Sequence, residues 1–228
     1  MNFKSNIIAI GGLKNSGKNE AANMLQYCLN SPKFMHHFWC YKLFRGVFNG
    51  YRITSFAHPL KRTLAALLNV PIEMFDLRSF KENTYIYFPT LTMTDHPNPD
   101  LVISDNKFSR AIMNKDFSFL TNNYITIRQL LQCFGTEIMR GLFGDNLWIL
   151  STLKESGKLI ISDLRFKVEA EALKQLNGTL IYINRVGCVP GNHASEKESI
   201  ELLNTNQFDY VINNDGSLRD LFNKIKAL

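Results

Sequence analysis

The 228-residue sequence lacks any apolar run that approaches the about 18 residues needed by a membrane-spanning helix. Its first residues, 1–5, lead directly into an apolar segment at 7–10 and show no signal-peptide pattern. The cysteines form no CxxC pair and no Cys/His metal-binding spacing. They lie far apart, at Cys28, Cys40, Cys133 and Cys188. These absences disfavour a membrane partner and a disulfide framework, and they predict reduced thiols in a cytoplasmic protein.

Charged residues are also few, at 20% of the chain, whereas apolar residues make up 45%. This balance excludes a fully disordered chain and allows a sizeable core. The 26 Lys and Arg exceed the 20 Asp and Glu, so the formal charge is +6, and it is scattered. That charge suits an anionic ligand, nucleic acid or simple solubility. The length predicts one domain, residues 1–228, with room for an insertion.

Short apolar segments alternate with amphipathic helical segments along most of the chain. The expected strands are residues 6–10, 52–56, 159–162, 180–183 and 210–213. The expected helices are residues 19–28, 59–68, 167–176 and 217–227. Continuous apolar runs such as Leu159-Ile160-Ile161 are typical of parallel strands covered on both faces. We therefore expect an α/β fold of three layers, with a parallel sheet flanked by helices.

Two stretches interrupt this alternation, and no internal repeat or low-complexity tract is present. Residues 30–50 are aromatic and basic, and we expect the end of a helix and a connection there. Residues 82–124 are rich in polar residues and contain three prolines. We expect these residues to form an insertion, either a flap or a small subdomain over one end of the sheet.

A glycine-rich loop lies between the first expected strand and the first expected helix. Its GxxxxGK pattern is formed by Gly12, Leu13, Lys14, Asn15, Ser16, Gly17, Lys18 and Asn19. In this context the backbone N–H groups and the helix N-terminus would face a phosphate group, and Lys18 would reach the β- and γ-phosphates. Asn19 stands where a Ser or Thr usually binds Mg²⁺. The alternative is an ordinary turn between a strand and a helix.

Asp163 follows the apolar segment 159–162, as in a Walker B strand, where the aspartate holds a Mg²⁺-bound water. The alternative is that Asp163 caps a helix. Arg165 follows closely, and Glu169 lies four residues later on the same helical face. We expect Arg165 to bind a substrate phosphate and Glu169 to hold Arg165. The other interpretation is a surface ion pair.

Residues 126–140 read as a helix in which Arg128 and Gln132 lie one turn apart. The arginine offers a bidentate fork to a phosphate, and the glutamine offers a donor and an acceptor to a base edge. Gly135-Thr136 indicates a break or a close approach, and Trp148 follows. A solvated face with an incidental Arg and Gln is the alternative.

The segment 185–200 begins with Arg185 at a strand end and continues as a polar loop. This arrangement is typical of a phosphate-transfer lid, in which Arg185 would neutralise charge on closure. The later loop at 209–217 could pack on a purine through backbone groups around Asn214. Ser217 is also a candidate helix N-cap, and both roles are compatible.

Taken in order, five blocks of the chain resemble the bacteriophage-type deoxynucleoside monophosphate kinases, a P-loop family. They are residues 12–19, 55–61, 127–140 with Trp148, 161–169 and 209–218. The resemblance implies a P-loop kinase fold and phosphorylation of deoxynucleoside 5′-monophosphates by ATP with Mg²⁺. It also implies roles for a set of residues, with Asn19 and Asp163 near the metal. These are Lys18, Lys61, Arg128, Gln132, Trp148, Asp163, Arg165 and Glu169.

The sequence departs from the family pattern at Asn19 and His58, where carboxylates are common, and at Gln129, where a basic residue is common. The last strand and loop also resemble dephospho-coenzyme A kinases, so a kinase of another phosphorylated small molecule is the second hypothesis. A nucleic-acid-binding P-loop ATPase is the third and least favoured. The expected partners are small-molecule nucleotides rather than a membrane or nucleic acid, in the host cytoplasm if the source is a virus, and a homodimer is the one assembly considered.

Overall fold

The computed structural model describes residues 3, 5–87, 92–94, 124–154, 157–189 and 194–228. The chain divides into two compact units, which are described separately below. The sheet unit comprises Met1–His58 and Trp148–Leu228, and the inserted unit comprises Pro59–Leu147.

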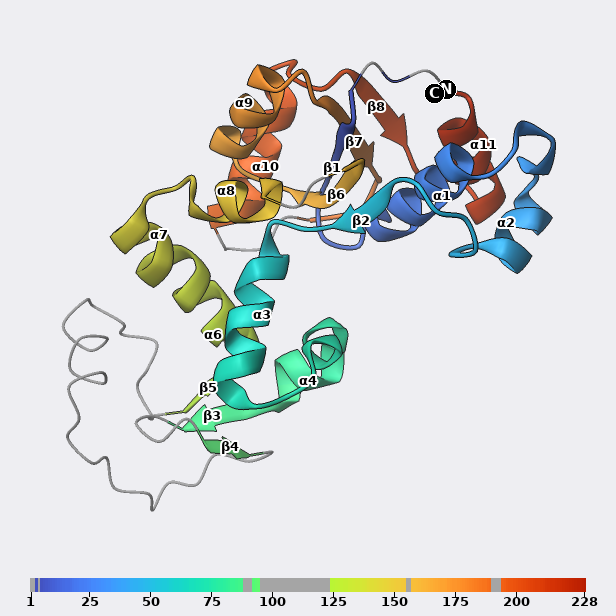
Figure 1. The fold of residues 1–228 in the computed structure, drawn as a ribbon. Coiled ribbons are helices and arrows are strands. Elements are labelled where there is room, and N and C mark those ends of the chain that lie inside the picture. The colour runs from blue at the N-terminus through green and yellow to red at the C-terminus, as the bar shows by residue number, and fades with distance from the viewer. Residues whose placement is uncertain (1–2, 4, 88–91, 95–123, 155–156, 190–193) are drawn as a thin grey trace. The chain divides into compact units, whose positions relative to one another are not determined.

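Five parallel strands form the sheet of the first unit, in the order β2-β6-β1-β7-β8 (Figure 1). The strands are β1 (Ile7–Gly11), β2 (Arg52–Thr54), β6 (Leu159–Leu164), β7 (Thr179–Asn184) and β8 (Tyr210–Asn213). The central strand β1 pairs with β6 on one side, where Ile8 lies opposite Ile160, and with β7 on the other. Both of these isoleucines are fully buried. The expected parallel sheet with apolar central strands is therefore confirmed.

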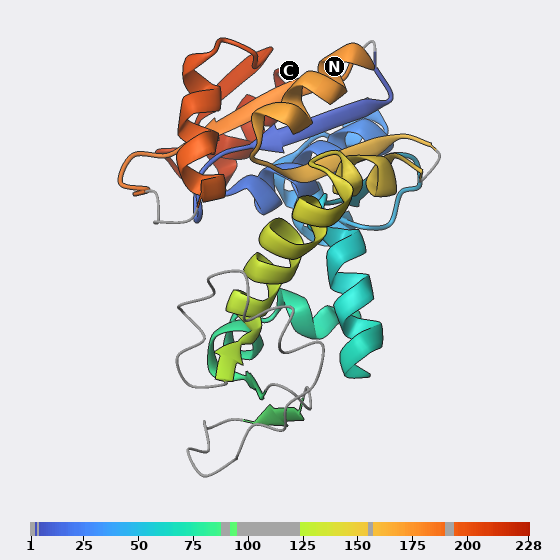
Figure 2. The same ribbon diagram turned by 90° about the vertical axis from the view of Figure 1, so that its left-hand side faces the viewer.

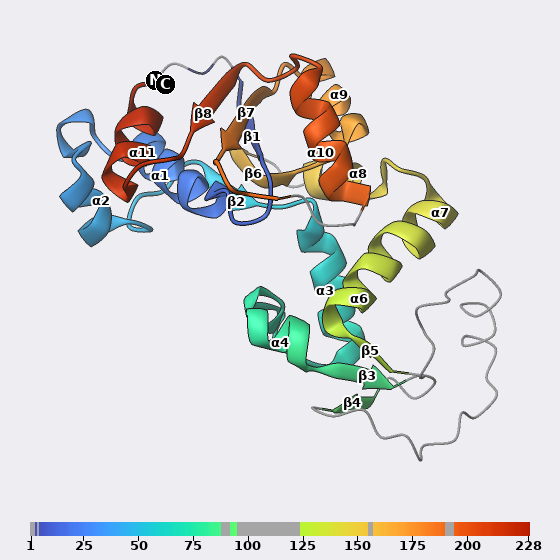
Figure 3. The same ribbon diagram turned by 180° about the vertical axis from the view of Figure 1, so that it is seen from behind.

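Helices cover both faces of this sheet, as Figures 1 and 3 show. One face carries α1 (Lys18–Asn30) and α11 (Leu218–Lys226), and the other carries α9 (Lys167–Gln175) and α10 (Ala194–Asn204). Apolar side chains of α1 and α11, including Met24 and Phe222, join the strand residues in one core. The coarse expectation of an α/β fold with a flanked parallel sheet is confirmed.

Residues 30–50 contain more regular structure than the sequence indicated. A 3₁₀ turn at Lys33–Met35 precedes a short helix, α2 (Phe38–Phe44), where only a connection was expected. The buried Tyr41 ring stacks on Phe222, with centroids 5.6 Å apart, and the Tyr41 hydroxyl donates to Glu20. Contacts distant in sequence therefore hold a helix whose own apolar pattern is weak.

The inserted unit combines helices with a three-stranded antiparallel sheet (Figure 2). The strands are β3 (Tyr85–Tyr87), β4 (Thr92–Thr94) and β5 (Tyr124–Thr126). Before them come α3 (Ala57–Leu68), which begins in the sheet unit, the 3₁₀ turn η2 (Ile72–Asp76) and α4 (Arg78–Asn83). The rest of the expected flap, residues 88–91 and 95–123, lies outside the described residues.

The helix expected at 126–140 is present as three contiguous segments, which follow β5 directly. They are α6 (Ile127–Gln132), the π-helical η3 (Cys133–Ile138) and α7 (Met139–Phe143). A further helix, α8 (Leu147–Leu153), leads back to the sheet unit. Within the described residues, no helix combines the length and apolar character needed to cross a membrane.

Candidate functional site

The glycine-rich loop connects β1 to α1 at the carboxyl end of the central strand. Gly12 and Gly17 have φ angles of 142° and 95°, which side chains rarely tolerate. A Cβ atom on Gly12 would lie 2.5 Å from the Ile183 carbonyl oxygen, and one on Gly17 would lie 2.5 Å from Asn214 Nδ2. Glycine is therefore required at both ends of the loop, and backbone rather than side-chain atoms line these turns.

Lys18 is the first residue of α1 and is buried against the loop that precedes it. Its Nζ donates a hydrogen bond to the Leu13 carbonyl at 2.5 Å, so the ammonium lies over the loop backbone. Ser16 contributes a buried hydroxyl that has no hydrogen-bond partner among the described residues. Lys14, Asn15 and Asn19, in contrast, are exposed. A lysine ammonium and an unsatisfied hydroxyl thus lie within one loop.

Asn214 follows β8 and braces the loop from within the sheet unit. Its Nδ2 donates to the Ser16 carbonyl at 2.8 Å, and its backbone N–H donates to the Asn184 carbonyl at 2.7 Å. The residue is buried, so these contacts fix the loop against the ends of β7 and β8. The sequence pointed to a purine-packing role for this position, which stays a prediction. Ser217 accepts from the Asp220 N–H, so the expected N-cap of α11 is confirmed.

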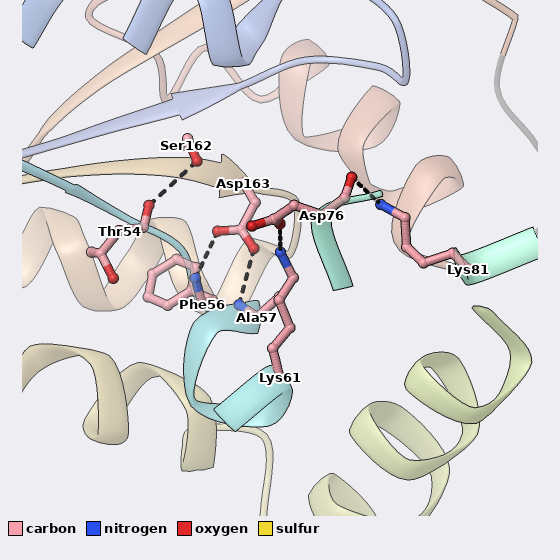
Figure 4. Close-up of polar contacts among 8 residues, drawn as sticks. All are labelled: Thr54, Phe56, Ala57, Lys61, Asp76, Lys81, Ser162 and Asp163. Atoms are coloured by element: carbon pink, nitrogen blue, oxygen red, sulfur yellow. Dashed lines mark hydrogen bonds and ion pairs between the residues drawn. The ribbon is translucent and has the colours of Figure 1, made fainter. Parts of the chain in front are cut away.

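Asp163 lies within β6, and both of its carboxylate oxygens accept backbone hydrogen bonds. Oδ1 accepts from the Phe56 N–H at 2.7 Å and Oδ2 from the Ala57 N–H at 3.0 Å (Figure 4). Asp163 therefore caps the start of α3, as the capping alternative proposed, although that helix lies about one hundred residues earlier. Each oxygen retains a second lone pair, so it can still accept a hydrogen bond from a water molecule bound to a metal ion.

Glu169 and Arg165 form the turn between β6 and α9. Glu169 is 2% exposed, and its Oε2 accepts from the backbone N–H groups of Arg165 and Phe166 at 3.0 and 3.1 Å. The Glu169 carboxylate is therefore not at the surface. This carboxylate fixes the backbone that carries Arg165.

The remaining predicted residues of the sheet unit differ in exposure. Arg185 is exposed where β7 ends, in the first part of the expected lid, whereas residues 190–193 of that lid lie outside the described residues. Trp148, which the family resemblance implies as a site residue, is buried at 6% exposure, so little of its ring is open to solvent.

In the inserted unit, two lysines converge on Asp76. Lys61 Nζ lies 2.6 Å from Asp76 Oδ1, and Lys81 Nζ lies 3.5 Å from the Asp76 carbonyl oxygen (Figure 4). Lys61 is a predicted substrate residue on α3, whereas Lys81 on α4 carries no motif and was not singled out. Burial lowers the pKa of Lys81, and the charges of Lys61 and Arg128 lower it further.

Arg128 on α6 lies beside the same helix α4. Its Nη2 bonds to Glu82 Oε1 at 2.9 Å, and Arg78 Nε bonds to the other Glu82 oxygen at 3.0 Å. Hydrogen bonds from Arg78, then from Arg128, hold the pKa of Glu82 below its usual value. The Nε of Arg128 is buried and has no hydrogen-bond partner among the residues that the structure describes. Lys61, Arg78, Lys81 and Arg128 are called the cation cluster below.

Gln132 closes α6 one turn after Arg128 and is partly buried, so the two residues lie on one helix as expected; their joint role in substrate binding stays a prediction. Gly135 in η3 allows a close approach, since a Cβ there would lie 2.6 Å from Leu60 Cδ2. The structure thus brings two predicted substrate residues, Lys61 and Arg128, into one cluster around Lys81. Sequence reasoning missed Lys81 because its neighbours come from separate elements.

Comparisons with known proteins agree on one family. The family model for deoxynucleotide monophosphate kinases matches residues 68–225, more than half of the chain. The deoxynucleotide monophosphate kinase of Enterobacteria phage T4 is 32% identical over 110 residues, which cover 44% of each chain. That of Escherichia phage RB69 is 29% identical over 116 residues, covering 47% of this chain and 46% of its own.

A third relative is a putative deoxynucleotide monophosphate kinase of Acanthamoeba polyphaga mimivirus. It is 28% identical over 117 residues, which cover 44% of this chain and 59% of the mimivirus protein. The chain therefore spans about half the length of the curated relatives it matches. The expectation from the five sequence blocks is confirmed: the chain belongs to the deoxynucleotide monophosphate kinase family.

Proposed function

We propose that the chain transfers the γ-phosphoryl group of ATP to deoxynucleoside 5′-monophosphates on a three-layer P-loop kinase fold. The observation that carries this proposal is the strand–loop–helix of residues 12–19, with Lys18 over its backbone, in a chain of the deoxynucleotide monophosphate kinase family. The curated relatives carry the name of this activity, and the chain spans about half of their length.

On the donor side, the loop would bind the ATP phosphates through backbone N–H groups at the start of α1. Lys18 would leave the Leu13 carbonyl and neutralise charge on the transferred phosphoryl group. Asn214 would keep the loop in its binding conformation through its bond to the Ser16 carbonyl. Arg185, exposed at the end of β7, would add a cation when the lid segment 185–200 closes.

Mg²⁺ accompanies ATP in phosphoryl transfer and neutralises charge on the phosphate oxygens. The residues present fit such an ion held mainly by phosphates and water, because Mg²⁺ needs only one or two protein carboxylates. Asp163 would accept hydrogen bonds from water of the metal shell through its free lone pairs. Asn19, exposed in the first turn of α1, would contribute an amide oxygen.

On the acceptor side, Arg128 and Lys61 of the inserted unit would bind the monophosphate, and Gln132 would read the edge of the base. Arg165, on the turn of the sheet unit that Glu169 fixes, is kept as a phosphate-binding candidate. Trp148 is kept as a substrate-binding candidate from the family resemblance, although its burial leaves little ring surface for stacking.

In the proposed reaction, an oxygen of the acceptor phosphate forms a bond to the γ-phosphorus of ATP. The bond between that phosphorus and the β,γ-bridging oxygen breaks, and ADP leaves. The acceptor oxygen is already ionised at neutral pH, so no strong general base is needed. The protein would act by positioning and charge neutralisation.

The test is a panel of dAMP, dCMP, dGMP, dTMP and dephospho-coenzyme A, each with ATP and Mg²⁺. Coupled ADP release and chromatography of the products would be recorded for the wild type and for Lys18→Ala. We expect deoxynucleoside diphosphates from several members of the panel, and formation at least about a hundredfold slower with the variant. Transfer to dephospho-coenzyme A alone would favour the second hypothesis, and ATP hydrolysis that only DNA stimulates would favour the third.

A further inference from the structure

Lys81 has no part in the proposed function so far, although it belongs to the cation cluster and feels the charges of Lys61 and Arg128. Its Nζ contacts only the Asp76 carbonyl oxygen, at 3.5 Å, and among the described residues it forms no ion pair with a carboxylate. The side chain is partly buried, so solvent does not fully replace the missing partner. An ammonium that is partly withdrawn from water and has no carboxylate of its own favours a ligand that supplies negative charge.

The charges around Lys81 are unbalanced toward the positive. Lys61 and Arg128 face it from α3 and α6, and Asp76 and Glu82 are the acidic groups that face it from η2 and α4. Asp76 is already paired with Lys61, and Glu82 with Arg128. The lowered pKa of Lys81 reflects burial first and then this excess of nearby cations. The site therefore favours an incoming anion.

Arg128 supplies a second, independent observation. The Nη2 of Arg128 donates to Glu82. The Nε of Arg128, in contrast, is buried and donates to no acceptor among the described residues. Buried donors in folded proteins nearly always have acceptors, and an orphan donor indicates a missing partner. A purely structural ion-pair network would satisfy this donor. A phosphate oxygen between Lys81 and Arg128 would satisfy both side chains.

We propose that Lys81 is a direct ligand of the acceptor phosphate, which it binds together with Lys61 and Arg128 in the inserted unit. This inference rests on the proposed function, because the ligand is the phosphate monoester of a deoxynucleotide. Glu82 acts as a positioning residue that holds the Arg128 guanidinium and leaves its Nε free for the ligand. Asp76 positions Lys61 in the same way.

The first test compares Lys81→Met with Arg62→Met as a matched control. Arg62 is an exposed cation on α3, adjacent to Lys61, and its loss removes the same charge from the same unit. We expect Lys81→Met to raise the KM for the monophosphate about ten- to a hundredfold, the range of a charged hydrogen bond, with KM for ATP unchanged. Equal KM values for the two variants would overturn the proposal.

The second test uses pH, which also covers the case in which Lys81→Met fails to fold. Because its pKa is lowered, Lys81 loses its charge at lower pH than an ordinary lysine, and monophosphate binding should weaken on the alkaline side. Lys81→Arg keeps the positive charge at high pH. The loss of monophosphate affinity in alkali should therefore begin at a higher pH in this variant than in the wild type. Superimposable pH profiles of wild type and Lys81→Arg would contradict direct binding.

Failure of the inference and failure of the proposed function give different results. Calorimetric titration of the full chain with dTMP measures binding without requiring transfer. Transfer by the wild type, with Lys81→Met matching the Arg62→Met control, would refute the role of Lys81 alone. If the wild type binds dTMP but transfers nothing, the kinase activity is refuted. Weaker dTMP binding by Lys81→Met than by the wild type would then still support the anion site.

Discussion

The phosphate loop of the sheet unit and the cation cluster of the inserted unit are built in different ways. The loop is a short contiguous segment whose shape depends on backbone angles at Gly12 and Gly17 and on one brace, Asn214. The cluster consists of long side chains from α3, α4 and α6, held by Asp76 and Glu82.

This difference predicts how each region responds to substitution. A site made of backbone is sensitive to a change of shape, whereas a site made of charged side chains is sensitive to a change of charge. The loop is expected to control ATP and the cluster to control the acceptor. The predictions below test that division, beginning with the largest expected effect.

Lys18→Ala should lower kcat about a hundred- to a thousandfold while the fold stays intact, because this is the range for loss of one preorganised donor at the reacting group. Lys14→Ala is the matched control, because Lys14 is an exposed lysine of the same loop. Steady-state kinetics and circular dichroism would measure both effects. Activity of Lys18→Ala within tenfold of wild type would refute the assignment of the loop.

Arg128→Ala should raise the KM for the monophosphate about ten- to a hundredfold, lower kcat as alignment is lost, and leave the KM for ATP unchanged. Arg62→Ala serves as the control and should leave both constants unchanged, because it removes an exposed cation of the same unit that lies outside the cluster. A change confined to the KM for ATP would move Arg128 to the donor side.

Asn214→Ala should destabilise the chain by about 1–3 kcal/mol, because the buried Ser16 carbonyl loses its donor. The KM for ATP should rise as the loop loosens. Asn213→Ala, at the exposed neighbouring position, is the control, and thermal melts would compare the two. Equal melting temperatures for both variants would show that Asn214 does not brace the loop.

Gln132→Leu should reduce activity unevenly among the four deoxynucleoside monophosphates, by about two- to tenfold, because each base loses a different neutral hydrogen bond. Wild type should accept several of them, since a side-chain amide presents both a donor and an acceptor. Relative kcat/KM values across the panel are the measurement. An equal loss of kcat/KM for all four monophosphates would refute the base-reading role and leave Gln132 as a structural residue.

The smallest expected effect concerns Glu82 and acid. Its pKa is lowered in the folded chain, so its ion pairs stabilise the fold above the unfolded-state pKa, and this contribution disappears as pH falls through the folded-state value. The Tm difference between wild type and Glu82→Gln should therefore narrow on acidification. Glu73→Gln, on the exposed surface of η2, is the control. A Tm difference between wild type and Glu82→Gln that widens in acid would contradict a stabilising contribution of these ion pairs.

Much of the sheet unit could be predicted from sequence because its signals are local. Apolar runs identified the central strands, and GxxxxGK identified the loop. The helix α2 was missed because seven residues carry little periodicity and the stacking of Tyr41 on Phe222 supplies the stability. The capping partner of Asp163 was also beyond reach, since Phe56 and Ala57 lie far away in sequence.

The cation cluster depends even more on contacts between residues that are distant in sequence. Arg128 and Lys61 were accessible because family motifs contain them, whereas Lys81 becomes notable only when α4 packs beside α6. The burial of Trp148 was equally out of reach, because the sequence places an aromatic residue in the chain without showing how much of its ring stays exposed. Burial and charge balance depend on tertiary packing, so a single sequence does not reveal them.

The division between loop and cluster is tested most directly by measuring both Michaelis constants in Asn214→Ala and Arg128→Ala. The account predicts a crossed result. Asn214→Ala raises the KM for ATP and leaves that for the monophosphate unchanged, and Arg128→Ala does the reverse. Variants that both shift the same constant, or that shift both constants equally, would contradict separate donor and acceptor sites.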